Sequence, residues 1–242
     1  MTTLTSEEKT NLENKNVFEI KELVERDYNK IISDLIPLRF LKVKIDDIPK
    51  DLLKKLNDDK KQGVYIYGAA GVGKTHLGYS IILKYLSHTA NNYLKKIDND
   101  YEKYKTDWAN RDDDSRLFAI TNGFNLYRPN YYPLTTPIKM FNFPSMLQTI
   151  KNSYENELTM SIEDFNEKIL IVDDLGAEKF TDWSIENLYR LVNYRYENML
   201  TTVFISNLSL KELSQRVGDR IVSRIIEMCH LFKVEGKDRR LN

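Results

Sequence analysis

The residues of this sequence with the clearest chemical purpose form one run, from Gly68 to Thr75. The run fits the phosphate-binding pattern G-x-x-x-x-G-K-[ST] at every fixed position. Its glycines let the backbone come close to an anion, so that successive N–H groups can point at phosphate. In this pattern Lys74 reaches the β- and γ-phosphates of a nucleotide, and the Thr75 hydroxyl ligates Mg²⁺. The residues predicted to hold the nucleotide are Gly68, Ala69, Ala70, Gly71, Val72, Gly73, Lys74 and Thr75.

The flanking segments supply the context that this pattern requires. Val64–Tyr67 is β-branched and aromatic, which predicts a short buried strand. From Lys74 to about Ser87 apolar residues recur at helical spacing, and a helix that begins there directs the positive end of its dipole at the loop. The alternative is a plain glycine-rich turn between a strand and a helix, which the agreement of pattern and context disfavours.

Two acidic residues complete the predicted site. They follow the run Lys168–Val172, whose apolar residues are typical of a strand buried in a parallel sheet. Ligands of open α/β sheets bind at the carboxyl ends of strands. We therefore predict that Asp173 binds Mg²⁺ and that Asp174 orients the attacking water as a general base, with Glu178 as the alternative base. Paired acids after a strand also occur in ordinary turns, but the phosphate-binding loop upstream favours the functional interpretation.

Three further polar residues follow or belong to later elements. Asn207 follows the predicted strand Thr202–Ser206, where a carboxamide can donate to the γ-phosphate or to the attacking water, although Asn is also a common turn former. Arg220 and Arg224 are spaced to share one helix face. Their guanidinium groups could reach the γ-phosphate in a neighbouring subunit, or they could form a solvated basic face.

Composition limits the class of protein. The chain has 242 residues, enough for one large domain or for a domain with a small appendage. Its 36 basic and 36 acidic residues cancel, which argues against a uniformly basic nucleic-acid-binding surface but not against a local patch. The single cysteine, Cys229, excludes an intrachain disulfide and favours a reducing cytoplasm. The polar N-terminus resembles no signal or transit peptide, and no apolar run approaches the roughly 20 residues that span a bilayer, so we predict a cytoplasmic protein without membrane contact.

Strand and helix patterns alternate along most of the chain, which predicts an α/β fold with a mostly parallel sheet. Further strands are predicted at Ile138–Phe143 and Leu231–Val234. Helices are predicted at Asp51–Lys61, from Ser145 as the N-cap to about Leu158, and at Trp183–Leu200, Ser209–Val217 and Arg220–Met228.

Two segments interrupt this alternation. Residues 17–38 have apolar side chains three or four apart, which predicts one or two amphipathic helices that pack on the chain's own core or bind a partner. Residues from about 88 to 137 form an insertion rich in Asn, Asp and Tyr. We predict poor order there rather than a surface that stacks single-stranded bases, with one hairpin at Asn122-Gly123. The predicted division is therefore an N-terminal helical segment and linker at 1–50, and a nucleotide-binding domain at 51–242 that contains the insertion.

The ordered set of motifs resembles the AAA+ ATPases of the DnaC/DnaI helicase-loader and IstB transposition-helper group. The segments that carry the resemblance are Gly68–His76, Ile171–Lys179, Trp183–Glu197, Phe204–Leu208 and Gly218–Arg224. The resemblance extends from about Ile36 to the C-terminus, apart from the insertion. It implies a Walker A site at 68–75 followed by His76, a Walker B site at Asp173 and Asp174, a sensor at Asn207, and an arginine finger at Arg220 with Arg224 as the second choice. It also places Pro37–Phe40 near the adenine.

The resemblance implies a P-loop NTPase domain of the AAA+ type, with a parallel sheet flanked by helices. The helical lid of fuller AAA+ proteins is expected to be absent, because the sequence stops just after the last predicted strand. The implied function is that of a slow ATPase that binds ATP, Mg²⁺ and single-stranded DNA. It would self-associate through Arg220 in trans and deliver a hexameric replicative helicase to DNA. The helices at about 17–35 would hold that helicase.

Three other functions compete with this one. A transposition helper would share every catalytic residue and differ only in its partner. A nucleotide-dependent scaffold would hydrolyse ATP negligibly, since the shorter Asp174 replaces a longer glutamate base. A small-molecule kinase is disfavoured because it would need neither the arginine pair nor the sensor strand.

Overall fold

The computed structural model describes residues 6–110, 138–155 and 160–238. The chain forms two compact units. One contains the described N-terminal residues up to Asp34 together with the segment that starts at Leu86, and the other contains Leu35–Tyr85 and the described residues from Ile138 onward. The hairpin predicted at Asn122-Gly123 lies outside the described residues. Among the helices that the structure describes, none is long and apolar enough to cross a membrane.

The second unit is built on a five-stranded sheet in which every neighbouring pair of strands is parallel. The strands are β1 (Gly63–Tyr67), β2 (Ile138–Asn142), β3 (Ile169–Leu175), β4 (Thr201–Ser206) and β5 (Cys229–Lys233), in the spatial order β2-β3-β4-β1-β5. Val64 in β1 pairs with Val203 on one side and with His230 on the other. The predicted α/β fold with a parallel sheet is therefore confirmed.

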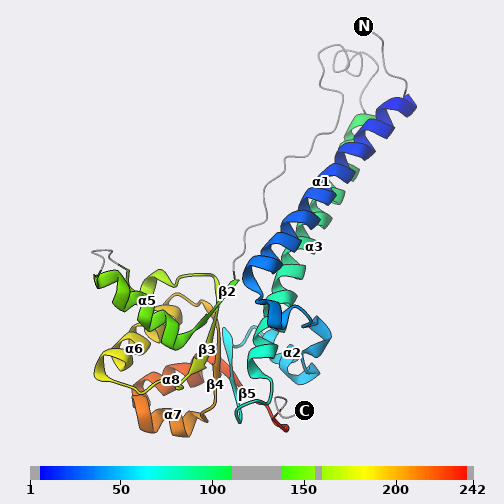
Figure 1. The fold of residues 1–242 in the computed structure, drawn as a ribbon. Helices are drawn as coiled ribbons and strands as arrows, with labels where there is room; N and C mark the ends of the chain where they lie inside the picture. Colours follow the sequence, from blue (N-terminus) through cyan, green and yellow to red (C-terminus); the bar gives the residue numbers. More distant parts are fainter. Residues whose placement is uncertain (1–5, 111–137, 156–159, 239–242) are drawn as a thin grey trace. The chain divides into compact units, whose positions relative to one another are not determined.

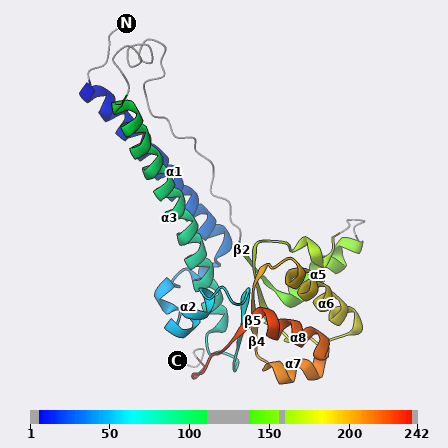
Figure 2. The ribbon, with the colours of Figure 1, turned by 180° about the vertical axis from the view of Figure 1, so that it is seen from behind.

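Helices cover both faces of this sheet, as Figures 1 and 2 show from opposite sides. α5 (Phe143–Glu155), α6 (Asp182–Glu197), α7 (Leu210–Val217) and α8 (Asp219–Met228) lie on one face. α2 (Lys50–Leu56) and the first turns of α3 (Lys74–Ala109) lie on the other. Three short 3₁₀ helices complete the unit: η1 (Leu38–Phe40), η2 (Ile45–Asp47) and η3 (Ile162–Asp164). The core beneath α5–α8 is fully buried at Phe143, Leu191 and Phe204.

The start of α5 differs from the prediction. The helix begins at Phe143, and Ser145 lies inside its first turn instead of capping it. The cap is Asn142, whose Oδ1 accepts from the backbone N–H of Ser145 at 3.3 Å. A side-chain oxygen at this place satisfies one of the N–H groups that a helix start leaves unpaired.

We expect Asn142→Ala to lower the free energy of unfolding by about 1 kcal/mol, because the alanine cannot accept that bond. Urea unfolding followed by circular dichroism measures the change. Asn142→Ser retains a capping oxygen and should recover most of the loss. Equal losses in the two variants would show that the cap does not carry the effect.

Arg195 on α6 is fully buried and contacts the sheet through hydrogen bonds. Its guanidinium group donates to the side chain of Thr202 at 2.6 Å and to the carbonyl oxygens of Thr201 at 2.8 Å, Glu167 at 3.0 Å and Phe165 at 3.2 Å. Burial lowers the pKa of Arg195 to about 10, which still leaves it charged at neutral pH. This arginine belongs to the motif Trp183–Glu197, and its contacts give it a structural role at the amino ends of β3 and β4.

The first unit pairs two long helices. α1 (Ser6–Leu35) packs on the part of α3 that follows Leu86. The contact buries Val17, Val24, Ala90, Ile97 and Tyr101. Polar contacts flank these apolar residues: the hydroxyl groups of Tyr28 and Ser87 share a hydrogen bond of 2.6 Å, and Lys21 pairs with Asp98 at 2.6 Å.

One prediction changes here, and another becomes more definite. The helix that starts at the phosphate-binding loop continues to Ala109, well beyond Ser87. Residues 88–109 are therefore helical, and the prediction of poor order is wrong for that part of the insertion. Residues 17–35 belong to one helix that packs on the chain itself, although Phe18 on that helix stays 60% exposed.

Candidate nucleotide-binding site

The phosphate-binding loop connects β1 to α3 and lines a cavity of about 390 Å³. Gly71 has a φ of 78° and Gly73 a φ of 100°, which side chains rarely tolerate and glycine adopts freely. Backbone N–H groups in such a loop form a concave anion site at the start of a helix. The residues that line the cavity are Arg39, Phe40, Ala70, Gly71, Gly73, Lys74, Thr75, His76, Asp174 and Asn207.

Lys74 is held inside the loop by three oxygen atoms and is only 6% exposed. Its Nζ donates to the carbonyl oxygens of Gly68 at 2.9 Å and Ala69 at 2.7 Å, and to Oδ1 of Asn207 at 2.7 Å. The third bond brings the end of β4 to the loop after β1, because β1 and β4 are neighbours in the sheet. The structure therefore places Lys74 and Asn207 together, although many residues separate them in sequence.

Asp173 lies at the end of β3, next to Thr75, and is 6% exposed. Burial raises its pKa to about 6, and the neighbouring charge of Asp174 acts in the same direction. A hydrogen bond with the Thr75 side chain and the charge of Lys74 oppose that rise. Oδ1 of Asp173 is buried and has no hydrogen-bond partner among the described residues. An orphaned carboxylate oxygen beside a threonine hydroxyl fits a site for Mg²⁺, which prefers oxygen ligands.

We expect Asp173→Asn to stabilise the metal-free protein above pH 6. The carboxyl has a folded pKa near 6 against 3.8 ordinarily, so its ionisation costs folding free energy that builds up between those pH values. Asparagine removes the charge, so the free energy of unfolding should rise by about 1–3 kcal/mol at pH 8 and hardly at pH 4. Urea unfolding with EDTA at both pH values measures this. A gain that is the same at pH 4 and pH 8 would contradict the explanation.

Asp174 sits on a local irregularity of β3. The pairing of β3 with β4 passes from Val172 opposite Phe204 to Leu175 opposite Ser206, so β3 contains one extra residue. Asp174 has a φ of 55°, a conformation in which Asp and Asn are the least strained of the residues with a Cβ. Its Oδ2 accepts from Nδ2 of Asn142 at 2.8 Å, and its side chain lines the cavity.

Glu178, the alternative base, lies on the loop after β3 and outside the set that lines the cavity. Burial raises the pKa of Glu178, and both of its carboxylate oxygens are buried without a hydrogen-bond partner among the described residues. Arg216 also donates to the carbonyl oxygen of Gly176 at 3.2 Å. Because Asp174 lines the cavity and Glu178 does not, the geometry favours Asp174 as the base.

The segment before β1 closes another side of the cavity. Phe40 stacks on Tyr79 of α3 with ring centroids 4.6 Å apart, and Arg39 and Phe40 both line the cavity. His76 is joined to Oδ2 of Asp47 at 2.8 Å, which ties η2 to the first turn of α3. A backbone hydrogen bond from Lys44, followed by the bond with His76, lowers the pKa of Asp47. These contacts are compatible with the prediction that Pro37–Phe40 lies near an adenine.

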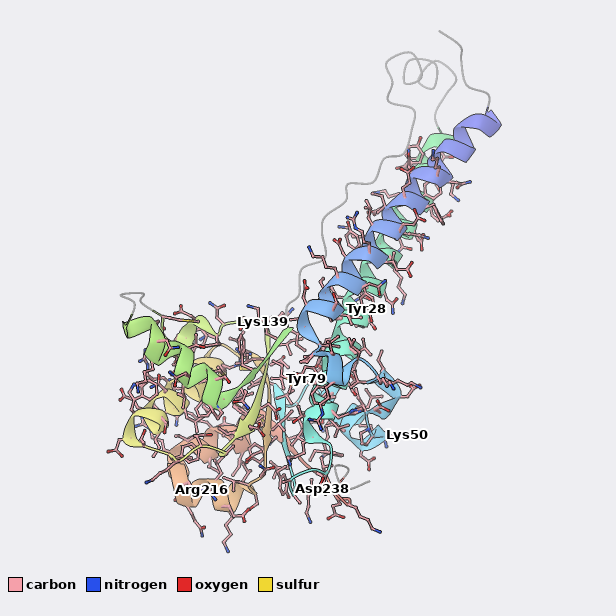
Figure 3. The ribbon with its side chains drawn as sticks, viewed as in Figure 1. Tyr28, Lys50, Tyr79, Lys139, Arg216 and Asp238 are labelled. Atoms are coloured by element: carbon pink, nitrogen blue, oxygen red, sulfur yellow. The ribbon has the colours of Figure 1, made fainter. Side chains whose placement is uncertain are left out.

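The chain passes the loop again after β5. Val234 donates its backbone N–H to the carbonyl oxygen of Tyr67 at 2.7 Å. The side chain of Asp238 lies where a Cβ on Gly71 would stand. Figure 3 labels Asp238 and Tyr79 in this unit. Gly71 is thus required by this close approach as well as by its backbone conformation.

Arg220 and Arg224 lie on α8 and do not line the cavity of their own chain. Both guanidinium groups lie over the ring of Tyr189 on α6, at 4.4 Å for Arg220 and 5.4 Å for Arg224. The predicted site thus separates into two groups, one around the phosphate-binding loop and one on α8. The second group does not contribute to the lining of the cavity.

The sequence analysis missed Asn142 as a site residue. Asn142 is the last residue of β2, caps α5 and donates to the carboxylate of Asp174. The signal was present, because Asn142 lies near the end of the predicted strand Ile138–Phe143, much as Asn207 follows the predicted strand Thr202–Ser206. What the sequence could not supply is that β2 is the neighbour of β3, with Asn142 opposite Asp173.

The chain is similar to one known family and to several curated proteins. Residues 144–242 match the family model described as "IstB-like ATP binding protein". The replicative helicase loader DnaI of Bacillus subtilis is 26% identical over 236 residues, which covers 87% of this chain and 60% of DnaI. The phage-like element PBSX protein XkdC of Bacillus subtilis is 36% identical over 81 residues, 31% of this chain and 30% of XkdC. The matches with the curated relatives cover between 30% and 61% of those relatives' own lengths.

Two solved structures share the fold. A crystal structure of the DnaC helicase loader has a TM-score of 0.52 and 22% identity, covering 82% of this chain and all of that one. A crystal structure of DnaI has a TM-score of 0.50 and 20% identity, covering 85% of this chain and 94% of that one. These findings confirm the P-loop AAA+ fold and the resemblance to the DnaC/DnaI and IstB-like group.

Proposed function

We propose that this chain, a relative of the DnaC/DnaI helicase loaders and the IstB-like ATP-binding proteins, is a slow ATPase that loads a replicative helicase. The observation that carries the ATPase part is the meeting of Lys74, Asn207 and Asp174 at one cavity. Lys74 and Asn207 share a hydrogen bond, and all three residues line that cavity. The loader part is supported by the similarity to DnaI over 87% of this chain.

In this proposal the loop N–H groups and Lys74 bind the phosphates of ATP. Thr75 and Asp173 hold Mg²⁺, which supplies neutralisation of phosphate charge when it is bound. Asp174, held by Asn142, orients and deprotonates the attacking water. Asn207 contacts the γ-phosphate side of the cavity and so senses hydrolysis. Aspartate reaches a shorter distance than glutamate would, so we expect turnover below about 1 per second without a partner.

The helical pair formed by α1 and the later part of α3 is the proposed contact with the helicase. Its outer surface keeps Phe18 60% exposed beside a hollow lined in part by Val24, Tyr28 and Leu94. An exposed aromatic side chain over an apolar hollow is typical of a protein-binding surface. Self-association through Arg220 in trans and binding of single-stranded DNA belong to the same proposal.

The second candidate function is that of a transposition helper. The match of residues 144–242 to the IstB-like family favours it. A transposase would then replace the helicase as the partner, with the same nucleotide chemistry. A scaffold with negligible hydrolysis is the third candidate, and it shares the nucleotide-binding residues.

The test is co-elution with the host's hexameric replicative helicase on a sizing column, with ATP, with ADP, and with Lys74→Ala in place of the wild type. We expect a complex with ATP that Lys74→Ala weakens. Phe18→Ser should weaken the complex, whereas Glu19→Ser, which changes the adjacent exposed residue, should not. The absence of a complex under every condition would overturn the loader proposal, and pull-down with a candidate transposase would then test the second candidate.

A further inference from the structure

Arg220 and Arg224 on α8 lie against two tyrosines of α6, Tyr189 and Tyr196. Arg220 lies 4.4 Å from the ring centre of Tyr189, and Arg224 lies 5.4 Å from the same ring and 5.9 Å from that of Tyr196. Arg224 also donates through Nη1 to the carbonyl oxygen of Arg220 at 3.2 Å. The two tyrosines are two turns apart on α6, so the arginines stand on one aromatic face of that helix.

Nearby acids on α8 are engaged with hydroxyl groups instead of with these arginines. Glu227 accepts from the hydroxyl of Tyr196 at 2.7 Å, and Asp219 accepts from the hydroxyl of Ser214. Within residues 160–238 neither Arg220 nor Arg224 forms an ion pair. No carboxylate of that segment therefore neutralises either charge.

A guanidinium group stacked on a ring keeps its N–H donors in the plane of the group. Donors in that plane are directed past the edge of the ring and not into it, where a phosphate can receive them in a bidentate contact. A carboxylate partner would fix the same arginine equally well, but it would occupy the donors and cancel the charge. Tyr189 therefore restrains the side chain of Arg220 and leaves its N–H donors unoccupied.

We infer that Tyr189 is a positioning residue that holds Arg220 ready to contact the nucleotide of a neighbouring subunit. This inference rests on the proposed ATPase function and on Arg220 acting in trans. Tyr189 touches no nucleotide itself, and it acts by limiting the conformations of Arg220. Tyr196 has the corresponding role for Arg224, at a longer distance.

The experiment mixes two inactive variants of the full chain. Asp174→Asn lacks the general base but retains Arg220, and Arg220→Ala retains the base but lacks the finger. If Arg220 acts in trans, the mixture recovers ATPase activity that neither variant has alone. Failure to recover activity would overturn the trans finger, and the present inference with it.

Tyr189→Leu is then added to one partner at a time. In the Asp174→Asn subunit, which donates Arg220, we expect it to lower the recovered turnover about 3- to 10-fold, the loss of one cation–π contact. In the Arg220→Ala subunit, which only accepts the finger, we expect no change. If Tyr189→Leu lowers the recovered activity equally in the donor and in the acceptor subunit, the positioning role is refuted. Recovery of activity with the unmodified donor would still support the trans finger.

Matched variants separate positioning from folding. Tyr189→Phe keeps the ring and should retain full activity in the donor. Tyr194→Leu makes the same change elsewhere on α6 and should have no effect. A Tyr189→Leu donor should bind ATP and assemble at the same concentration as its parent, with the loss confined to the turnover number. A loss with Tyr189→Phe as large as with Tyr189→Leu would overturn the inference.

Discussion

Replacing Asp174 with Asn should lower ATP turnover about 100-fold or more, because general bases contribute at least that factor. ATP affinity should change little. Asparagine has the same shape as aspartate, tolerates the positive φ of 55° and can still accept the bond from Asn142. The change therefore removes the proton acceptor and leaves the geometry of the cavity.

Single-turnover hydrolysis of radiolabelled ATP measures the loss, and titration with a fluorescent ATP analogue measures the affinity. Glu178→Gln is the control, since Glu178 lies close by but does not line the cavity. We expect Glu178→Gln to change turnover by less than about threefold. A larger loss from Glu178→Gln than from Asp174→Asn would transfer the role of the base to Glu178.

Lys74→Ala should lower the affinity for ATP about 100-fold. Lys74 is the buried cation of the loop, and charge-assisted hydrogen bonds to phosphate are each worth about 1.5–3 kcal/mol. In the structure its Nζ is already bonded to Gly68, Ala69 and Asn207, so the loop is shaped around the ammonium group before a phosphate arrives.

Thermal unfolding with and without ATP and Mg²⁺ reports the binding, because a ligand that binds only the folded state raises the melting temperature. The wild type should shift upward and Lys74→Ala should not. Lys84→Ala, further along α3 and over the ring of Tyr85, should behave as the wild type does. An undiminished shift in Lys74→Ala would mean that the nucleotide binds elsewhere.

The phosphate-binding loop could be read directly from the sequence because its chemistry is local. Glycines, the lysine and the threonine lie next to one another, and the strand and helix around them have clear periodicity. The two adjacent acids of β3 could be located for the same reason. The contact between Lys74 and Asn207 could be anticipated only in outline, since it depends on β1 and β4 being neighbours.

The other features of the fold and of the site depend on tertiary structure and could not be predicted from local sequence patterns. Asn142 becomes part of the site because β2 pairs with β3, which no local pattern specifies. The continuation of α3 past Ser87 was hidden by composition, although Ala90, Ile97 and Tyr101 keep helical spacing and bury against α1. Arg220 could be proposed by resemblance, but its contact with Tyr189 on another helix could not.

The extra residue in β3 has a consequence for how this site can change. In a regular strand consecutive side chains face opposite ways, so two adjacent acids would serve two different surfaces. Here Asp173 contacts Thr75 while Asp174 lines the cavity, so both acids lie at the phosphate-binding loop. Deleting either acid would do more than remove one charge. It would restore the regular register between β3 and β4, and the side chains next to the remaining acid would then face the opposite side of the sheet. The spacing of this pair is therefore tied to the register of β3, so the pair tolerates substitution better than deletion.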